Sequence, residues 1–323
     1  MAPFDEIWKK NAQDEALKFA GKIFDAKDTI VSFVDNRLGW EGSAQYDTLL
    51  AGSFNISLKV QRGGSNQYAI IRFPFQGKSF EPWGEEKVTN EAMTMEYIRK
   101  HTQIPIPTVH YWGNTEQSPG KLGPFLIMDF VEGENLGRFL AAPTDDKSAP
   151  IVLNPEIDAY ILDGIYEQIA QFILELSRLE FPRIGAIAPD HSSGKWNVVG
   201  RPLTYDMNEV VTAGGCSPTE VTLNKSFDSA QDFFQACTEF FQKHLEVQRN
   251  ISGDDDVAWK QFVARQCLAK LVPKFTIDHS GPFRLFCDDF RPSNMLIDPK
   301  THRIVAVFDF EFTNAMPAQF IED

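Results

Sequence analysis

The chain has 323 residues, of which 43% are hydrophobic and 24% are charged, and 27 of them are phenylalanine. This composition argues against a disordered protein and fits one large domain or two modest ones. The formal net charge of −14 argues against a nucleic-acid partner, because the overall field of the protein repels a phosphate backbone.

The N-terminal residues and the cysteines indicate the compartment. Met1–Glu6 carries acidic residues where a secretory signal carries basic ones, and no apolar core segment follows it. No uninterrupted apolar stretch approaches the roughly 20 residues that a membrane-spanning helix needs. The sequence therefore predicts a cytoplasmic protein without a membrane partner. The cysteines show no C-x-x-C spacing, which favours free thiols over a disulfide framework or a zinc site: Cys216, Cys237, Cys267 and Cys287.

The first half of the chain has the pattern of an antiparallel sheet with helices. Residues 4–26 combine charged and apolar side chains as an amphipathic helix does, and residues 85–101 predict a second helix. Between about 46 and 74 the side chains alternate between apolar and polar, which is typical of strands, and a turn is expected at 63–66. The clearest strands are expected at 56–60, 68–73, 109–112 and 125–130.

The second half, after a turn at Glu132-Gly133, has mainly helical spacing. Apolar residues three and four apart between Ile161 and Leu179 predict a long helix that stops at Pro182. Residues 186–224 predict loop with short pieces of structure. Further helices are expected at 227–248 and 256–272, and strands at 284–287, 295–298 and 304–308. A sheet half followed by a helical half indicates an α+β chain in two lobes, an N-lobe over 1–131 and a C-lobe over 132–323.

The strongest chemical signal lies near the end of the chain. Asp289 and Asn294 are five residues apart in a loop between two short strands, and Asp309 follows the next hairpin strand. Phosphoryl transfer requires a carboxylate that orients and deprotonates the attacking hydroxyl, together with oxygen ligands for Mg²⁺. Asp289 can supply the first, and Asn294 with Asp309 can supply the second. An Asp and an Asn at this spacing also occur in ordinary loops, so the joint pattern with the flanking strands carries the prediction.

These motifs resemble the aminoglycoside phosphotransferase and choline kinase family. That family reads H-x-D-x-x-x-x-N, three hydrophobic residues and D, and then V-I-D-W/F-E; the corresponding segments here are CDDFRPSNMLID and VFDFEF. The resemblance, which includes uncharacterised fungal members, implies a bilobal protein-kinase-like fold. It also implies that ATP and Mg²⁺ are the cofactors and that a hydroxyl group of a small molecule accepts the γ-phosphoryl group.

The resemblance assigns roles to residues of the first half. The segment Gly52, Ser53, Phe54 and Asn55 corresponds to the loop that covers the phosphates, where glycine allows close approach of the backbone. Arg72 stands where kinases have the lysine that holds the α- and β-phosphates. Glu91 is expected to pair with Arg72, and Glu96 is the alternative. The backbone from Asp129 to Val131 is expected to bind the adenine edge.

Some residues depart from the family pattern. Cys287 replaces the usual His, Ser293 replaces a common Gly, and Arg291 lies near the expected position of the transferring phosphate, where it could stabilise the developing charge. Only 14 residues follow Asp309, so the activation segment of a conventional protein kinase is not expected. These departures keep open an alternative, a nucleotide-binding pseudokinase or scaffold with little or no activity. The sequence specifies neither the acceptor nor the oligomeric state.

Overall fold

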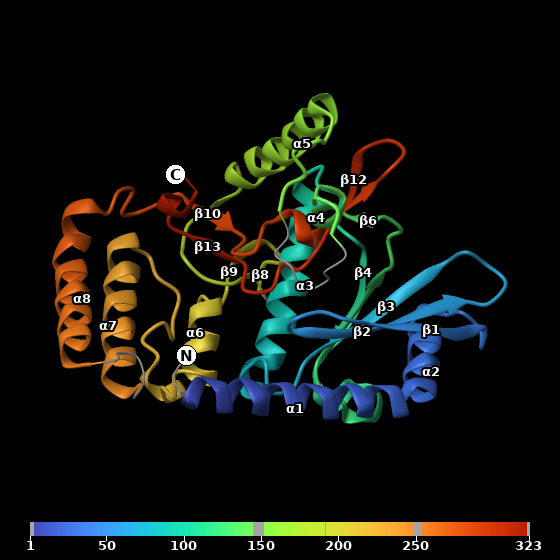
Figure 1. Cartoon of the computed structure of the whole chain (residues 1–323), viewed down its shortest axis with the longest axis horizontal. Helices are drawn as coiled ribbons and strands as arrows, with labels where there is room; N and C mark the ends of the chain where they lie inside the picture. Colours follow the sequence, from blue (N-terminus) through green and yellow to red (C-terminus); the bar gives the residue numbers. More distant parts are fainter. Residues whose placement is uncertain (1–2, 145–151, 191, 249–253, 322–323) are drawn as a thin grey trace.

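The computed structural model describes residues 3–144, 152–190, 192–248 and 254–321. Its first half is a five-stranded antiparallel sheet with strand order β1-β2-β3-β5-β4, covered by helices on both faces (Figure 1). The strands are β1 (Ala44–Ala51), β2 (Asn55–Arg62), β3 (Tyr68–Pro74), β4 (Val109–Gly113) and β5 (Phe125–Asp129), and the helices are α1 (Pro3–Asp25), α2 (Lys27–Leu38) and α3 (Gly84–His101).

Strand alternation explains why this sheet is buried on both faces. In β5, Phe125 and Ile127 pack with α1 and α2, whereas Leu126 and Met128 pack with α3. The predicted helices 4–26 and 85–101 and the predicted strands of this half are confirmed. Helix α2 was not predicted from the sequence. It buries residues such as Ile30 and Val34, which are four apart, but its β-branched residues weaken the helical signal.

The second half is mainly helical, with small sheets between the helices (Figure 1). The helices are α4 (Leu136–Phe139), α5 (Ala159–Ser177), α6 (Tyr205–Thr212), α7 (Ala230–Val247) and α8 (Asp255–Phe275). Two three-stranded sheets have the orders β13-β10-β7 and β12-β11-β6, and β8 pairs with β9. The strands are β6 (Glu134–Asn135), β7 (Glu180–Phe181), β8 (Ile187–Pro189), β9 (Trp196–Val198), β10 (Phe283–Phe286), β11 (Met295–Asp298), β12 (Arg303–Val307) and β13 (Asn314–Met316). Short 3₁₀ helices occur at Glu81–Trp83, Thr115–Gln117, Pro119–Lys121, Pro218–Glu220, Pro292–Asn294 and Ala318–Phe320.

The predicted α+β organisation, with a sheet half and a helical half, is confirmed. The segment 186–224 does contain short pieces of structure: the hairpin of β8 and β9, and helix α6, whose N-cap Thr204 accepts a hydrogen bond from the Met207 N–H. The first two residues of the segment Met1–Glu6 and the last two residues of the predicted C-lobe lie outside the described residues. No described helix has both the length and the apolar character that crossing a membrane requires.

The hairpin of β11 and β12 positions the chemical motif. Met295 pairs with Val307, and the N–H of Phe308 donates to the carbonyl of Asn294 at 3.1 Å. This register places Asn294 beside the residue that precedes Asp309. One hydrophobic core holds the hairpin in place, because Met295 and Val307 pack in the same cluster as Ala92 of α3.

Candidate functional site

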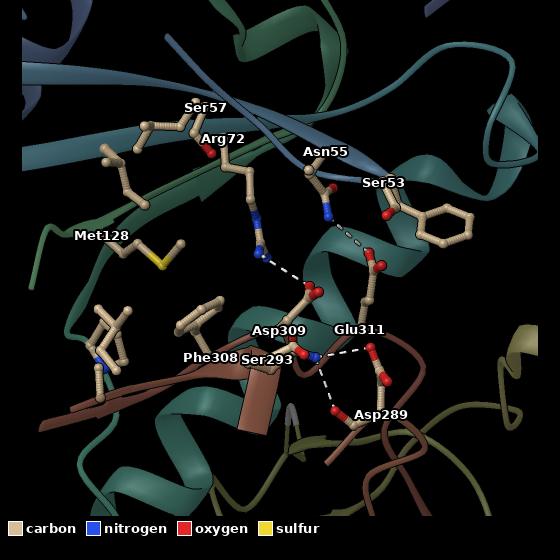
Figure 2. A pocket seen from close by; sticks show the side chains of 18 of the residues that line it. Ser53, Asn55, Ser57, Arg72, Met128, Asp289, Ser293, Phe308, Asp309 and Glu311 are labelled. Atoms are coloured by element: carbon tan, nitrogen blue, oxygen red, sulfur yellow. Dashed lines mark hydrogen bonds and ion pairs between the residues drawn. The ribbon is translucent and has the colours of Figure 1, made fainter. Parts of the chain in front are cut away.

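A cavity of about 780 Å³ contains nearly all of the predicted site residues, and residues of both halves of the chain line it. This volume is in the range of small-molecule and cofactor sites. In Figure 2, Ser57, Arg72 and Asn55 of the sheet half lie across the cavity from Asp289 and Asp309. Of the predicted residues, Glu91 alone does not line it; those that do are Gly52, Ser53, Phe54, Asn55, Arg72, Asp129, Val131, Asp289, Arg291, Asn294 and Asp309.

Arg72 lies at the centre of a buried charge cluster. It projects from β3, and its Nη2 forms an ion pair with Oε2 of Glu91 on α3 while its Nη1 lies 3.4 Å from Oδ1 of Asp309 (Figure 2 shows the second contact). Burial by itself would lower the pKa of Arg72, but the negative charges of Glu91, Asp309 and Glu311 outweigh burial and raise it. The Arg72 guanidinium is therefore held in its charged form between two carboxylates.

The structure distinguishes the two acids that could pair with Arg72. Glu91 is 3% exposed, and its second oxygen, Oε1, accepts a hydrogen bond from the Phe310 N–H at 3.2 Å. Glu96 lies at the surface and pairs with Lys100, 2.5 Å away on the same helix. Glu91 is thus the acid of α3 that contacts both Arg72 and the segment after Asp309.

The segment from Asp309 to Phe312 has a constrained backbone. Asp309 and Phe312 have φ angles of 69° and 63°, in the left-handed region that residues other than glycine rarely adopt. Each such residue costs on the order of 1–3 kcal/mol, so the surroundings must hold the turn. Burial and the neighbouring Glu311 raise the pKa of Asp309 above the ordinary carboxyl range, although Arg72 opposes this. A cation placed at Asp309 would favour its ionised form.

Glu311 is a cavity residue to which the sequence assigned no role. One of its oxygens, Oε2, accepts a hydrogen bond from Nδ2 of Asn55 at 3.2 Å (Figure 2) and forms an ion pair with Nζ of Lys87. Burial would raise the pKa of Glu311, but the charge of Lys87 lowers it. Lys87 is 2% exposed and precedes Glu91 by four residues on α3. That spacing places both residues on one face of the helix, and it is the feature of the sequence from which Lys87 could have been placed near Glu91.

Asp289 and Asn294 are in direct contact. Nδ2 of Asn294 donates to Oδ2 of Asp289 and to the Asp289 carbonyl, each at 2.9 Å. The amide nitrogen makes both bonds, and no donor among the described residues bonds to the amide oxygen of Asn294, so that oxygen can bind a cation. The other carboxylate oxygen of Asp289 lies 2.7 Å from Nε of Arg291, whose side chain is 59% exposed. The predicted base therefore has a fixed orientation and an exposed cation beside it.

Two neighbours of Asp289 have raised pKa values. Burial raises the pKa of the Cys287 thiol to about 12, so the residue that stands in place of the family's His is a neutral thiol. Asp288 lines the cavity, and burial together with the charges of Asp206 and Asp289 raises its pKa. Asp206 belongs to α6, an element that the sequence did not predict as a helix.

The backbone of 129–131 offers one unpaired donor to the cavity. The N–H of Asp129 donates to the Thr108 carbonyl at 3.0 Å, and that of Phe130 donates to the Tyr68 carbonyl at 3.3 Å. The N–H of Val131 makes no hydrogen bond within the described residues and lies in the cavity lining. The carboxylate of Asp129 turns to His110, whose Nε2 lies 2.6 Å from Oδ1. Val131 thus presents a backbone donor to the cavity, whereas the carboxylate of Asp129 is engaged by His110.

The loop of Gly52 to Asn55 contacts the helical half at two points. Asn55 reaches Glu311, and the Phe54 ring packs edge-on against Tyr205 of α6, with ring centroids 5.8 Å apart. Tyr205 in turn packs against Phe312 at 6.0 Å. The loop itself is closed by a hydrogen bond of 2.9 Å from the Gly52 N–H to the Asn55 carbonyl. Tyr205 was missed because contacts between distant segments leave no local sequence pattern.

The donor set suits magnesium better than a metal bound by protein alone. Among the described residues, no group of three or more His, Cys, Asp or Glu side chains is arranged to hold an ion. Mg²⁺ usually takes one or two protein oxygens and completes its octahedral coordination with water and phosphate oxygens. The carboxylate of Asp309 and the free amide oxygen of Asn294 fit that requirement.

Solved structures with a similar fold are phosphotransferases. Aminoglycoside phosphotransferase APH(4)-Ia is 14% identical, with a TM-score of 0.52 over 91% of this chain and 74% of that one. A mutant of it, in a ternary complex with ADP and hygromycin B, has a TM-score of 0.50 and the same identity over 90% and 74%. At this level of identity the comparison shows the fold, which is kinase-like.

Curated relatives come from fungi. Clavilactone A biosynthesis cluster protein Y of Ampulloclitocybe clavipes is 23% identical over 281 residues, which are 83% of this chain and 60% of that protein. A subtelomeric hrmA-associated cluster protein of Aspergillus fumigatus is 26% identical over 117 residues, 36% of this chain and 22% of that protein. The chain thus spans less than two thirds of the length of these relatives. The model of the phosphotransferase enzyme family matches residues 51–320, and this chain belongs to that family.

Proposed function

We propose that the protein transfers the γ-phosphoryl group of ATP, with Mg²⁺, to a hydroxyl group of a small molecule. The observation that carries this proposal is the convergence of Asp289, Asn294 and Asp309 on one cavity that also contains the loop of 52–55 and the backbone of 129–131. Phosphoryl transfer depends on positioning and electrostatic stabilisation, and these residues are the groups that it needs.

The sheet half of the cavity is assigned to the nucleotide. The free N–H of Val131 and the neighbouring carbonyls face the adenine edge, and the loop of Gly52 to Asn55 covers the phosphates. Arg72 anchors the phosphates as a guanidinium that is permanently charged. The ternary complex of an APH(4)-Ia mutant with ADP and hygromycin B supports a nucleotide and a small acceptor in this fold. The N-lobe over 1–131 and the C-lobe over 132–323 form the two walls in this proposal.

Asn294 and Asp309 are assigned to the metal. The amide oxygen of Asn294 and the carboxylate of Asp309 would hold Mg²⁺ through two protein oxygens. When bound, Mg²⁺ neutralises charge on the phosphate oxygens and orients them for in-line transfer. Arg72 lies 3.4 Å from Asp309 and keeps that carboxylate oriented before the metal arrives.

Asp289 is assigned as the base. It accepts the proton of the acceptor hydroxyl while the new O–P bond forms and the bond between the γ-phosphorus and the β,γ-bridging oxygen breaks, so that ADP leaves with the electron pair. Asn294 fixes the Asp289 carboxylate through Oδ2. Arg291 is largely exposed; in this proposal its guanidinium leaves the Asp289 carboxylate, binds the phosphate oxygens and stabilises the charge that develops on them.

A second candidate function is nucleotide binding without turnover. The observation that favours it is Cys287, a neutral thiol in place of the histidine of the family motif. In that case the protein binds Mg²⁺ and ATP and acts as a pseudokinase or scaffold. The cytoplasmic location stays a prediction from the sequence.

Calorimetry and turnover assays separate these functions. The wild type is expected to bind ATP in the presence of Mg²⁺, and Asp309→Ala is expected to abolish the effect of Mg²⁺ on that binding. Asp289→Asn should retain ATP binding and lose on the order of 10²-fold or more in phosphoryl transfer, measured with a panel of small hydroxyl compounds. Asp298→Asn is the matched control, because Asp298 only caps the exposed turn after β11 through Lys300 and Thr301.

Three outcomes would decide between the proposals. If ATP does not bind, or if Asp309→Ala binds it as the wild type does with Mg²⁺, the nucleotide assignment is wrong. If ATP binds but no compound receives phosphate, and Asp289→Asn leaves the background hydrolysis of ATP unchanged, the non-catalytic function is correct. A loss with Asp298→Asn equal to that with Asp289→Asn would remove the assignment of Asp289 as the base.

A further inference from the structure

One face of α3 holds the turn of 309–312 at two points. Glu91 accepts the hydrogen bond from the Phe310 N–H at 3.2 Å, and Lys87, one helical turn earlier, forms the buried ion pair with Glu311. The Lys87 ammonium also lies 5.5 Å from the centre of the Phe312 ring. Within this turn, Asp309 and Phe312 have positive φ, and Glu311, the partner of Lys87, lies between them in the sequence.

Lys87 lies outside the lining of the cavity, whereas Glu311 belongs to it. The side chain of Lys87 is 3% exposed, and its described charged partner is Glu311. A group in this position does not touch a nucleotide in the cavity. Lys87 therefore acts on the site indirectly, through its ion pair with Glu311 and its contact with the Phe312 ring.

Glu311 connects Lys87 to the loop that covers the cavity. The same oxygen that pairs with Lys87 accepts the hydrogen bond from Nδ2 of Asn55. Next to Asn55, Phe54 packs on Tyr205, which packs on Phe312. The loop of 52–55 is thus tied to the turn of 309–312 by a polar contact and by a chain of aromatic contacts, and Lys87 fixes the acceptor of the polar one.

We infer that Lys87 is a positioning residue: through Glu311 it holds the Asp309 turn in its strained conformation and ties the loop of 52–55 to it. This inference rests on the proposed function for its consequence, which is that the affinity for Mg²⁺ at the site depends on a lysine that touches neither nucleotide nor metal. The contact itself exists in the protein without a nucleotide, so it can be tested separately.

Hydrogen exchange of the nucleotide-free protein tests the positioning role. The double variant Lys87→Met/Glu311→Gln removes both charges and leaves no buried ion without its partner, which keeps the variant foldable. We expect the Gly52 amide, which is bonded to Asn55, and the Phe310 amide to exchange about tenfold faster or more than in the wild type. Lys87→Arg retains the charge and should restore most of the protection. Lys87→Met alone, if it folds, should resemble the double variant.

Binding of Mg²⁺ gives the second readout. In the presence of ATP, the apparent dissociation constant for Mg²⁺ should rise about tenfold in the double variant, whereas the affinity for ATP without metal should change little. The matched control is Lys100→Met/Glu96→Gln, which makes the same two substitutions in an ion pair at the surface of α3. That control should leave both readouts unchanged.

The inference is overturned if the double variant exchanges at the Gly52 amide as slowly as the wild type, or if Lys87→Arg is as impaired as the double variant. It is also overturned if the surface control accelerates exchange at Gly52 to the same extent. A wild type that does not bind ATP would refute the proposed function, and the exchange rates alone would then decide the positioning role of Lys87.

Discussion

Arg72→Lys tests whether the guanidinium bridges two carboxylates. Arg72 uses one terminal nitrogen for Glu91 and the other for Asp309, at 3.4 Å. A lysine ammonium is a single compact charge on a side chain of shorter reach, so it cannot contact both carboxylates in that geometry. We expect Arg72→Lys to keep the contact with the buried Glu91 and to lose the contact with Asp309.

The expected loss of stability follows from the exposure of the broken contact. A hydrogen bond between charged groups contributes about 1.5–3 kcal/mol to the free energy of unfolding. The Asp309 side chain is 24% exposed, so solvent offsets part of this and about 1.5–2 kcal/mol is expected. With a urea m-value of about 3 kcal/mol/M, the midpoint of unfolding should fall by about 0.5–0.7 M.

Urea unfolding followed by the fluorescence of the six tryptophans measures this shift. The control is Arg62→Lys, because Arg62 is exposed and its described side-chain partner is Oε1 of Gln67, at 3.2 Å. That control should change the free energy of unfolding by less than about 0.5 kcal/mol. An unchanged midpoint for Arg72→Lys, or an equal shift for Arg62→Lys, would show that the bridge between Glu91 and Asp309 contributes no stability.

Three further predictions concern single residues of the site. Because the pKa of Asp309 is raised in the folded state, the folded protein binds a proton that the unfolded chain has already released, and stability should fall as pH rises from the ordinary carboxyl range through that raised pKa. Asp309→Asn should flatten this part of the profile of melting temperature against pH. A profile identical to that of the wild type would contradict the assignment. Glu91→Gln should lower the free energy of unfolding by about 3 kcal/mol or more, because it leaves Arg72 without its buried partner. In the same urea assay, Glu96→Gln should change the free energy of unfolding by less than about 1 kcal/mol. Equal losses for the two variants would contradict this prediction. Burial raises the pKa of Cys287 to about 12, so iodoacetamide at pH 8 should alkylate Cys287 in the folded protein much more slowly than the exposed Cys267. Peptide mass spectrometry measures both rates. Equal rates would show that burial does not protect Cys287.

The sequence by itself determined which residues are the candidates for the site. Asp289, Asn294 and Asp309 could be named as candidates because the phosphotransferase pattern is a fixed order of oxygen ligands around one hairpin, and a hairpin is a local structure. The strands and most helices could be found for the same reason, since periods of 2 and 3.6 residues are local properties of the chain. Helix α2 and the short α6 were missed, because short or β-branched helices form chiefly through tertiary packing.

The tertiary structure decided which side chains act together. Glu91 and Glu96 are both acids of α3, and only the packing of that helix against the sheet shows that Glu91 contacts Arg72. Lys87 and Glu311 lie more than 200 residues apart, and no local sequence pattern indicates that they pair. Their contact exists because the hydrophobic core brings α3 against the end of the β11–β12 hairpin. Because this ion pair is buried, the attraction between its charges is stronger than in an exposed pair, since the protein interior screens charge far less than water does.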